Sequence, residues 1–281
     1  MNEQIQPSTL SVVRPGATKV RRRSFLQTHE STVYGTISIV CFLAVWEMVW
    51  QLRLISPLFF SGPSAIAVRF WELLTEGTLL RAAAYSGKNF VIGFVLALVS
   101  GVPLGILLGW YKRLNLFFDP LVNALYAMPR IALYPLIIIW FGIASGSKIF
   151  IVFLSAMLPI LVNTVAGVRN IDPDLLKAAR AFCAQDRQIF ATVALPYSVP
   201  FILTGVRQGV AHGLIGVIIG ELFAGSEGIG YMISYAGQMF QTDTLLVGVV
   251  VVMIAGMVLT ALGERVRRHF QRWRPDHVGG R

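Results

Sequence analysis

DPDLLKAARAFCAQDRQIFATVALP, residues Asp172–Pro196, is a polar segment that separates two strongly apolar stretches of the chain. Asp172 followed by Pro173 is typical of a helix start, because an Asp side chain caps free backbone N–H groups and proline suits the first helical position. Asp174 adds negative charge at the positive end of the helix dipole. The segment therefore predicts a helix that runs from Pro173 to Phe182.

The second half of this segment predicts another short helix. A break at residues 183–185 precedes it, Asp186 is its expected cap, and it is expected to end before Pro196. Two short helices at an angle would form a knob on the surface. Such a knob on a membrane bundle indicates docking to a partner.

The first of these helices has two kinds of surface. One face, at three-residue spacing, is formed by Leu176, Ala179 and Phe182. The basic side chains are expected to point to solvent, and they are Lys177, Arg180 and, further along, Arg187.

The composition indicates a polytopic membrane protein. The chain has 281 residues, of which 55% are hydrophobic and 14% charged, and a mean hydropathy of +0.67. A soluble domain is more polar and more highly charged than this. The net charge of +10 is no sign of nucleic-acid binding, because the basic residues stand just outside the apolar runs rather than on one surface. Cys41 and Cys183 lack metal-ligand spacing, so neither a metal site nor a disulfide is expected.

Span-length apolar stretches recur along the chain and predict an all-α bundle of six transmembrane helices. They cover approximately residues 32–52, 88–110, 121–141, 149–168, 200–223 and 244–262. The third is interrupted by Pro129 and Pro135. Because proline frees backbone carbonyls that a neighbour or a water-filled cavity must satisfy, this helix is a candidate pore wall.

The segments outside the spans divide the chain into three parts. Residues 1–30 are expected to be a disordered cytoplasmic tail, residues 31–263 the transmembrane domain with its loop at 169–197, and residues 264–281 a basic cytoplasmic tail. Between the first two spans, residues 64–74 fit either a short interfacial helix, with Ser61 and Ser64 as possible caps, or a simple connecting loop.

Two sets of glycines at four-residue spacing predict close helix packing, because small residues let helix backbones approach one another. The first set is Gly101, Gly105 and Gly109, and the second is Gly205, Gly209 and Gly213. The positive-inside rule then orients the bundle. The tails, the loop with Lys112 and Arg113 and the polar segment fall inside, so both termini are expected in the cytoplasm of a bacterial inner membrane, whereas Lys148 falls in an outer loop.

Ionisable residues within spans are functional candidates by default. They are Glu47, Arg207, His212 and Glu221. With Pro129 and Pro135, the last three are the candidates for the translocation path. Two of them also have a simpler interpretation. His212 could be a packed helix residue, and Arg207 could extend its charge to the membrane surface. Few positive charges line the spans, which gives no anion signature.

Nucleotide and catalytic motifs are absent from the sequence. No Walker A pattern occurs, and GSEGIG at residues 225–230 is interpreted as a turn or the start of a short outer helix rather than a phosphate loop. Neither a catalytic constellation nor a metal cluster is present in the sequence.

Several motifs together resemble the nitrate, sulfonate, taurine and thiamine-precursor permeases among the ATP-binding-cassette (ABC) importers. They are MPRIALYPLIIIWFGI, GSKIFIVF, VRNIDPDLLKAAR, LPYSVPFILTGVRQG and GEL-x-AGSEGIGYMI, which fall within residues 57–270. The resemblance implies a type I importer permease fold and a homodimer. It also implies a cytoplasmic ABC ATPase that binds ATP and Mg²⁺ while this chain binds no cofactor, and an extracytoplasmic binding protein that delivers a small solute.

The same resemblance implies that the polar segment is the loop that couples the permease to the ATPase. The coupling residues would be Asp172, Leu176, Lys177, Ala178, Ala179, Arg180, Phe182, Cys183, Ile189, Leu195 and Pro196. Two of them depart from the family pattern, since Lys177 stands where the family has Glu and Cys183 where it has Gly. A left-handed turn at Cys183 would cost roughly 1 kcal/mol.

Two other classes of function remain open from the residues alone. An ion-gradient-driven secondary transporter or channel would commonly carry inverted repeats, and no convincing repeat is visible. A membrane scaffold or enzyme is disfavoured because no catalytic cluster is visible.

Overall fold

The computed structural model describes residues 25–271, and in this range the chain forms helices without a strand. It divides into two compact units, Met1–Met48 and Val49–Arg281. Of the N-terminal tail, residues 1–24 lie outside the described residues, whereas residues 25–30 form the first turns of a helix. The prediction of a disordered tail up to residue 30 was therefore too long.

The first unit contains most of α1 (Phe25–Gln51). Its apolar part, Val33–Gln51, is long enough to cross a membrane, and no side chain in that window is buried. The predicted first span is thus confirmed, with a start seven residues earlier than residue 32.

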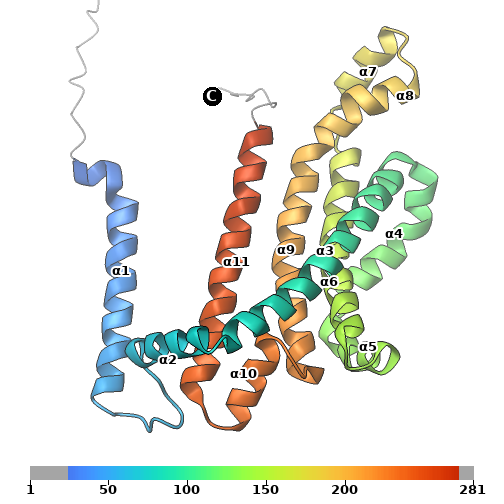
Figure 1. Cartoon of the computed structure of the whole chain (residues 1–281). Helices are drawn as coiled ribbons and strands as arrows, with labels where there is room; N and C mark the ends of the chain where they lie inside the picture. Colours follow the sequence, from blue (N-terminus) through green and yellow to red (C-terminus); the bar gives the residue numbers. More distant parts are fainter. Residues whose placement is uncertain (1–24, 272–281) are drawn as a thin grey trace, which may run out of the picture. The chain divides into compact units, whose positions relative to one another are not determined.

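The core of the second unit consists of three long helices, of which the middle one packs against the other two (Figure 1). α6 (Ser145–Arg169) packs on one side against α3 (Thr78–Trp110) and on the other against α9 (Leu195–Ala224). Its fully buried residues include the apolar side chains of Ile151, Val152, Ala156 and Ile160. These helices match the second, fourth and fifth predicted spans.

Glycines make this close packing possible. A Cβ atom on Gly105 of α3 would lie 2.6 Å from Cβ of Thr164 on α6. One on Gly205 of α9 would lie 3.1 Å from Cα of Ile160, so the backbones themselves are close. The remaining glycines of the two predicted sets also face neighbouring side chains, and they are Gly101, Gly109, Gly209 and Gly213.

The predicted third span is not a single helix. α4 (Lys112–Ala127) is followed by a 3₁₀ turn, η1 (Arg130–Leu133), and by α5 (Tyr134–Phe141), with a bend of 87° between the two parts. The break comes from Pro129, because the residue before a proline is forced into an extended conformation and Met128 has ψ 135°. Pro135 lies in the first turn of α5, where a missing N–H costs nothing, so it interrupts no helix.

The polar segment forms the two-helix knob that the sequence predicts, with one difference in its second half. α7 (Pro173–Ala181) ends as expected, but α8 (Asp186–Ile189) continues through a π-helical turn, η2 (Phe190–Ala194), into α9. The prediction that this helix ends before Pro196 was wrong. In the π turn the N–H of Leu195 bonds five residues back to Phe190. Pro196 then lies in the first turn of α9, where its missing N–H is tolerated.

Three further helices complete the second unit: α2 (Pro63–Thr75), α10 (Ile229–Gln238) and α11 (Thr242–Gln271). α2 confirms a short helix at residues 64–74 and excludes the simple loop, although its cap is Gly62 rather than Ser61 or Ser64. α10 confirms that GSEGIG leads into a short helix. α11 contains the sixth predicted span and continues into the expected basic tail, of which residues 272–281 lie outside the described range.

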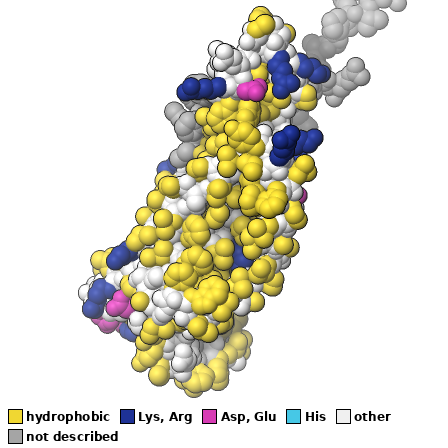
Figure 2. Space-filling view, turned by 90° about the vertical axis from the view of Figure 1, so that its right-hand side faces the viewer, with side chains coloured by type: hydrophobic (Ala, Val, Ile, Leu, Met, Phe, Trp, Pro, Cys, Tyr) yellow, Lys and Arg dark blue, Asp and Glu magenta, His cyan; other side chains and the backbone are white. Residues whose placement is uncertain are grey.

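The surface of the chain is that of a multi-pass membrane protein. Within residues 25–271 five helices are long and apolar enough to span a membrane, or six if the bent pair α4–α5 counts as one span. Hydrophobic side chains cover the middle of the face in Figure 2, while Lys, Arg, Asp and Glu gather toward its two ends. The knob of α7 and α8 lies at one end of the second unit, and α2 and α10 lie at the other (Figure 1).

Candidate functional site

The start of the knob is fixed by its own side chains. Oδ1 of Asp172 accepts a hydrogen bond of 2.8 Å from the backbone N–H of Asp174, which is the predicted cap of α7. The second helix of the knob is capped by Gln185 and not by Asp186, because the side chain of Gln188 accepts a 2.8 Å bond from the N–H of Gln185. Both short helices thus begin at defined residues.

The turn between the two helices is a Schellman motif, in which backbone N–H groups after the helix bond back to its last carbonyls. The N–H of Cys183 donates to the carbonyl of Arg180 and that of Ala184 to Ala179, at 2.9 and 3.1 Å. Cys183 takes the left-handed conformation, φ 55°, that this motif usually assigns to glycine. Cys183 therefore adopts the same turn as a glycine would, in a backbone conformation that is strained for a residue with a Cβ atom.

The knob carries a short apolar stripe among its exposed polar residues. Leu175, Ala178 and Phe182 are exposed at helical spacing, and Phe182 is 87% exposed. Leu176 and Ala179 are instead half-buried, so Phe182 does not lie with them as the three-residue spacing suggested. We name Leu175, Ala178 and Phe182 the knob stripe. Leu175 was not among the predicted residues.

The remaining coupling candidates lie around this stripe. Lys177 forms an exposed 2.9 Å ion pair with Asp174, and Arg180 is exposed. Ile189 is buried at the end of α8, whereas Leu195 and Pro196 are exposed at the start of α9.

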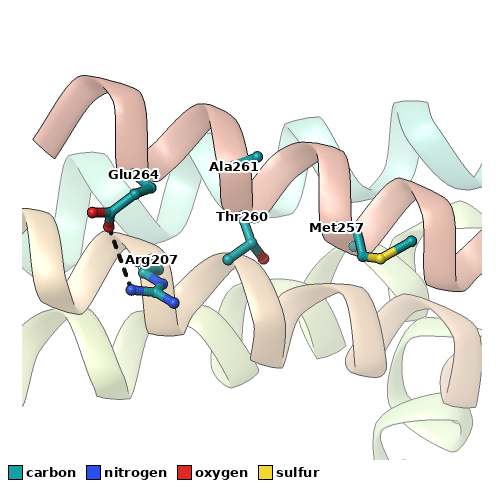
Figure 3. A pocket seen from close by; sticks show the side chains of 6 residues that line it. Arg207, Met257, Thr260, Ala261 and Glu264 are labelled. Atoms are coloured by element: carbon teal, nitrogen blue, oxygen red, sulfur yellow. Dashed lines mark hydrogen bonds and ion pairs between the residues drawn. The ribbon is translucent and has the colours of Figure 1, made fainter. Parts of the chain in front are cut away.

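Arg207 lies in an open groove of about 450 Å³ between α9 and α11. Its guanidinium approaches the carboxylate of Glu264 at 3.5 Å, with Thr260 and Met257 further along the same wall (Figure 3). Arg207 is thus directed toward α11.

Glu221 is a fully buried structural link between helices rather than a residue at mid-depth. Its Oε2 accepts hydrogen bonds from the Ser86 hydroxyl at 2.8 Å and from the N–H of Gly230 at 2.9 Å. Ser86 in turn accepts one from the N–H of Ile229. The carboxylate therefore caps α10 and joins it to α3 and α9.

Lys148 is fully buried in the first turn of α6, so its prediction as an outer-loop residue was wrong. Its ammonium group donates to the carbonyls of Ala224, at 2.7 Å, and of Ile143. It satisfies the carbonyl at the end of α9, as a cation near a helix C-terminus does.

A polar cluster lies near the middle of the long helices. His212 is exposed on α9, and one turn before it Gln208 accepts a 2.9 Å hydrogen bond from Asn163 of α6. At the bend of the α4–α5 pair, Arg130 donates to the carbonyl of Ser155 at 3.0 Å. We name Arg130, Tyr134, Ser155, Asn163, Gln208 and His212 the mid-depth cluster.

Arg130 is not among the functional candidates predicted from the sequence, although it follows directly on Pro129 within the predicted third span. Its guanidinium lies 5.7 Å from the ring centre of Tyr126. The signal was available, since an arginine inside a predicted span is a candidate by default. Pro129 and Pro135, both exposed, flank this position.

A metal-binding function finds no support in the described part of the chain. No group of three or more His, Cys, Asp or Glu side chains there could hold a metal ion.

Comparison with known proteins places these features in a family. The sequence profile for "Binding-protein-dependent transport system inner membrane component" matches residues 101–274. The aliphatic sulfonates transport permease SsuC of Bacillus subtilis (strain 168) is 31% identical over 245 residues, 87% of this chain and 89% of that protein. The taurine transport system permease TauC of Escherichia coli (strain K12) is 31% identical over 244 residues, 85% and 88% of the two chains.

A solved structure shows the same fold. The inward-facing MetNI methionine ABC transporter contains a chain that superimposes with a TM-score of 0.62 at 19% sequence identity. The match covers 70% of this chain and 97% of the other. The type I importer permease fold expected from the sequence motifs is therefore confirmed.

Proposed function

The chain belongs to the family of binding-protein-dependent transport system inner membrane components, and from this premise we propose that it works as half of an ATP-driven importer whose ATPase is a separate cytoplasmic subunit. It is a multi-pass membrane subunit of a transport system. ATP and Mg²⁺ would bind to the partner ATPase, and this chain would supply the path for the solute.

The knob stripe carries this proposal. An exposed phenyl ring on a polar, water-facing knob is costly unless a partner covers it, and aromatic residues often anchor protein interfaces. Leu175, Ala178 and Phe182 form such a patch on a helix whose start and end are both fixed. Docking of an ATPase groove on this stripe would let its closure move α7, and through the continuous helix α8–η2–α9 that movement would reach the core of the bundle.

The solute class follows from the relatives. Two of them carry the names of sulfonate and taurine permeases, and we propose that this chain passes a small sulfonate, taurine, nitrate or similar compound. An extracytoplasmic binding protein would deliver it to a pair of permease copies. Both termini and the knob would lie in the cytoplasm, in agreement with the basic residues at that end.

Reconstitution tests the coupling assignment. The purified chain in liposomes should hydrolyse no ATP alone, and should take up the solute only with a separate ATPase, the binding protein and ATP. Phe182→Asp should weaken the affinity for the ATPase at least about tenfold, because it places a charge in the centre of the contact. Phe182→Leu, which keeps the apolar contact, is the matched control.

A second variant tests the neighbouring positions. Bulky residues at both Lys177 and Ala179 should uncouple ATP hydrolysis from uptake. Unchanged affinity and uptake in Phe182→Asp and in the double variant would refute the docking site. Uptake by the chain alone, without ATP, would instead support the ion-gradient alternative.

A further inference from the structure

Arg130 is a charged side chain at a depth where charges are costly. It follows the break at Pro129, and its hydrogen-bond partner Ser155 lies near the middle of α6. Among residues 33–265, whose side chains the structure describes, Arg130 forms no ion pair. A charged residue inside a span is tolerated where it faces a water-filled cavity or a partner group.

The guanidinium keeps most of its hydrogen-bonding capacity. One N–H donates to the carbonyl of Ser155 at 3.0 Å, and the structure gives no second acceptor for this side chain among the described residues. A guanidinium has five N–H donors in a flat fork that matches carboxylate, sulfonate or phosphate oxygens. Arg130 is half-buried, so part of this fork is accessible.

The surroundings of Arg130 favour an anion over a cation. His212, whose imidazole can donate an N–H, stands on α9 one turn before Gly216, where a Cβ atom would lie 2.9 Å from the hydroxyl of Ser155. Tyr134 is held in place by a 3.2 Å hydrogen bond to the same hydroxyl. Asn163 donates to Gln208 one turn from His212 and continues the polar surface along α6 and α9. Within the described residues the mid-depth cluster contains donors and amides, and no carboxylate belongs to it.

The surroundings of Arg130 also differ from those of Arg207 on α9. Arg207 forms a 3.5 Å ion pair with Glu264 in the groove beside α11, so a carboxylate already neutralises its charge. Among the residues whose side chains the structure describes, the partners of Arg130 are the carbonyl of Ser155 and the ring of Tyr126. The guanidinium of Arg130 is therefore available to form an ion pair with an oxyanion that diffuses into the protein.

We propose that Arg130 and His212 form an anion-binding site midway along the translocation path, which holds the sulfonate or similar oxyanion group of the solute. This inference rests on the proposed function, and it assigns the substrate class to a place in the chain. A purely structural role is the competing explanation, in which Arg130 only ties the bend of α4–α5 to α6.

Equilibrium binding on the full chain separates the two explanations. The protein is placed in lipid nanodiscs, and the ¹⁹F linewidth of trifluoromethanesulfonate is followed while unlabelled ethanesulfonate displaces it. Arg130→Gln should lower the displaceable binding at least about tenfold, because a hydrogen-bonded charge contributes that much or more. Arg81→Gln, the same change at an exposed arginine at the start of α3, should bind as the wild type does.

A second variant fixes the outcome. His212→Asp replaces the imidazole donor with a negative charge and leaves Ser155 unchanged, and it should also lower the displaceable binding, even if Arg130→Gln fails to fold. Equal displaceable binding in the wild type and in the Arg130 or His212 variant would overturn the proposal, and so would its absence from the wild type.

Uptake of ethanesulfonate by the wild-type complex distinguishes this site from the function on which it rests. If uptake depends on ATP but ethanesulfonate binding is unchanged in the Arg130 variant, the anion site is refuted and the importer function is supported. If ethanesulfonate binding depends on Arg130 but no ATP-dependent uptake occurs, the importer function is refuted and the anion site is supported.

Discussion

Cys183 shows how much a single residue contributes to the knob. The family resemblance places a glycine at this position, and the structure shows why: the residue has φ 55° and ends α7 in a Schellman motif. A non-glycine residue in this conformation costs roughly 1 to 2 kcal/mol. The strain is local, because both hydrogen bonds of the motif are still made.

Cys183→Gly should therefore stabilise the full chain by about 0.5 to 1 kcal/mol, since the relief of strain exceeds the greater freedom of glycine in the unfolded chain. The free energy of unfolding in detergent and hydrogen exchange of the Ala184 amide would measure it. Cys183→Ala retains a Cβ atom and should bring no gain. An equal gain in both variants would show that the sulfur, and not the backbone, is responsible.

Residues whose partners lie close in the sequence could be predicted, and residues with distant partners could not. Asp172 and Asp174 stand two positions apart, so the cap of α7 follows from a local pattern. Lys148 bonds to Ala224, and Glu221 to Ser86, across the fold. Nothing near either residue in the sequence indicates that a buried carbonyl or hydroxyl will satisfy it.

At the scale of helices, glycine spacing holds the fold together. α6 is enclosed by α3 and α9 because their glycines leave room for its side chains, and Gly105 lies against Thr164 and the carbonyl of Leu161. The four-residue spacing predicts that a partner helix exists, but not which one. The partner of both glycine sets proved to be largely the same helix, α6.

Gly105→Ala should destabilise the protein by about 1 to 3 kcal/mol, because the added methyl would meet Cβ of Thr164 at 2.6 Å and must push the helices apart. Gly87→Ala is the matched control on the same helix, since a Cβ there has nothing within 4 Å. It should be neutral or slightly stabilising. Thermal unfolding in one detergent measures both, and equal midpoints would refute close packing at Gly105.

Helix continuity is the property that the sequence predicted least well. Two prolines suggested a kink in a third span, but only Pro129 breaks the chain, while Pro135 begins a new helix. Pro196 was expected to end a helix, yet α8, η2 and α9 are continuous past it. The effect of a proline depends on which carbonyls around it are satisfied, and this is decided by packing.

For the whole molecule, composition and the recurring apolar runs predicted the class of protein, and the resemblance of its motifs predicted the fold. Recurring apolar runs predict the spans, and the motifs agree with a fold that the MetNI chain shares. The mid-depth cluster required the structure, because Arg130, Ser155 and His212 come from three separate elements. Basic residues flanking the spans still give a clear prediction of which end faces the cytoplasm.

Accessible cysteines test that orientation in the intact molecule. Cys183 is exposed on the knob and Ser226 is exposed at the opposite end of α9, so both sites should react with a membrane-impermeant maleimide once reached. In a Cys41→Ser background, Cys183 should be labelled only after spheroplasts are permeabilised. With Ser226→Cys in a chain lacking both native cysteines, labelling should occur in intact spheroplasts. The reverse pattern would place the knob outside, where no ATPase could reach it, and would remove the physical basis for coupling through Phe182.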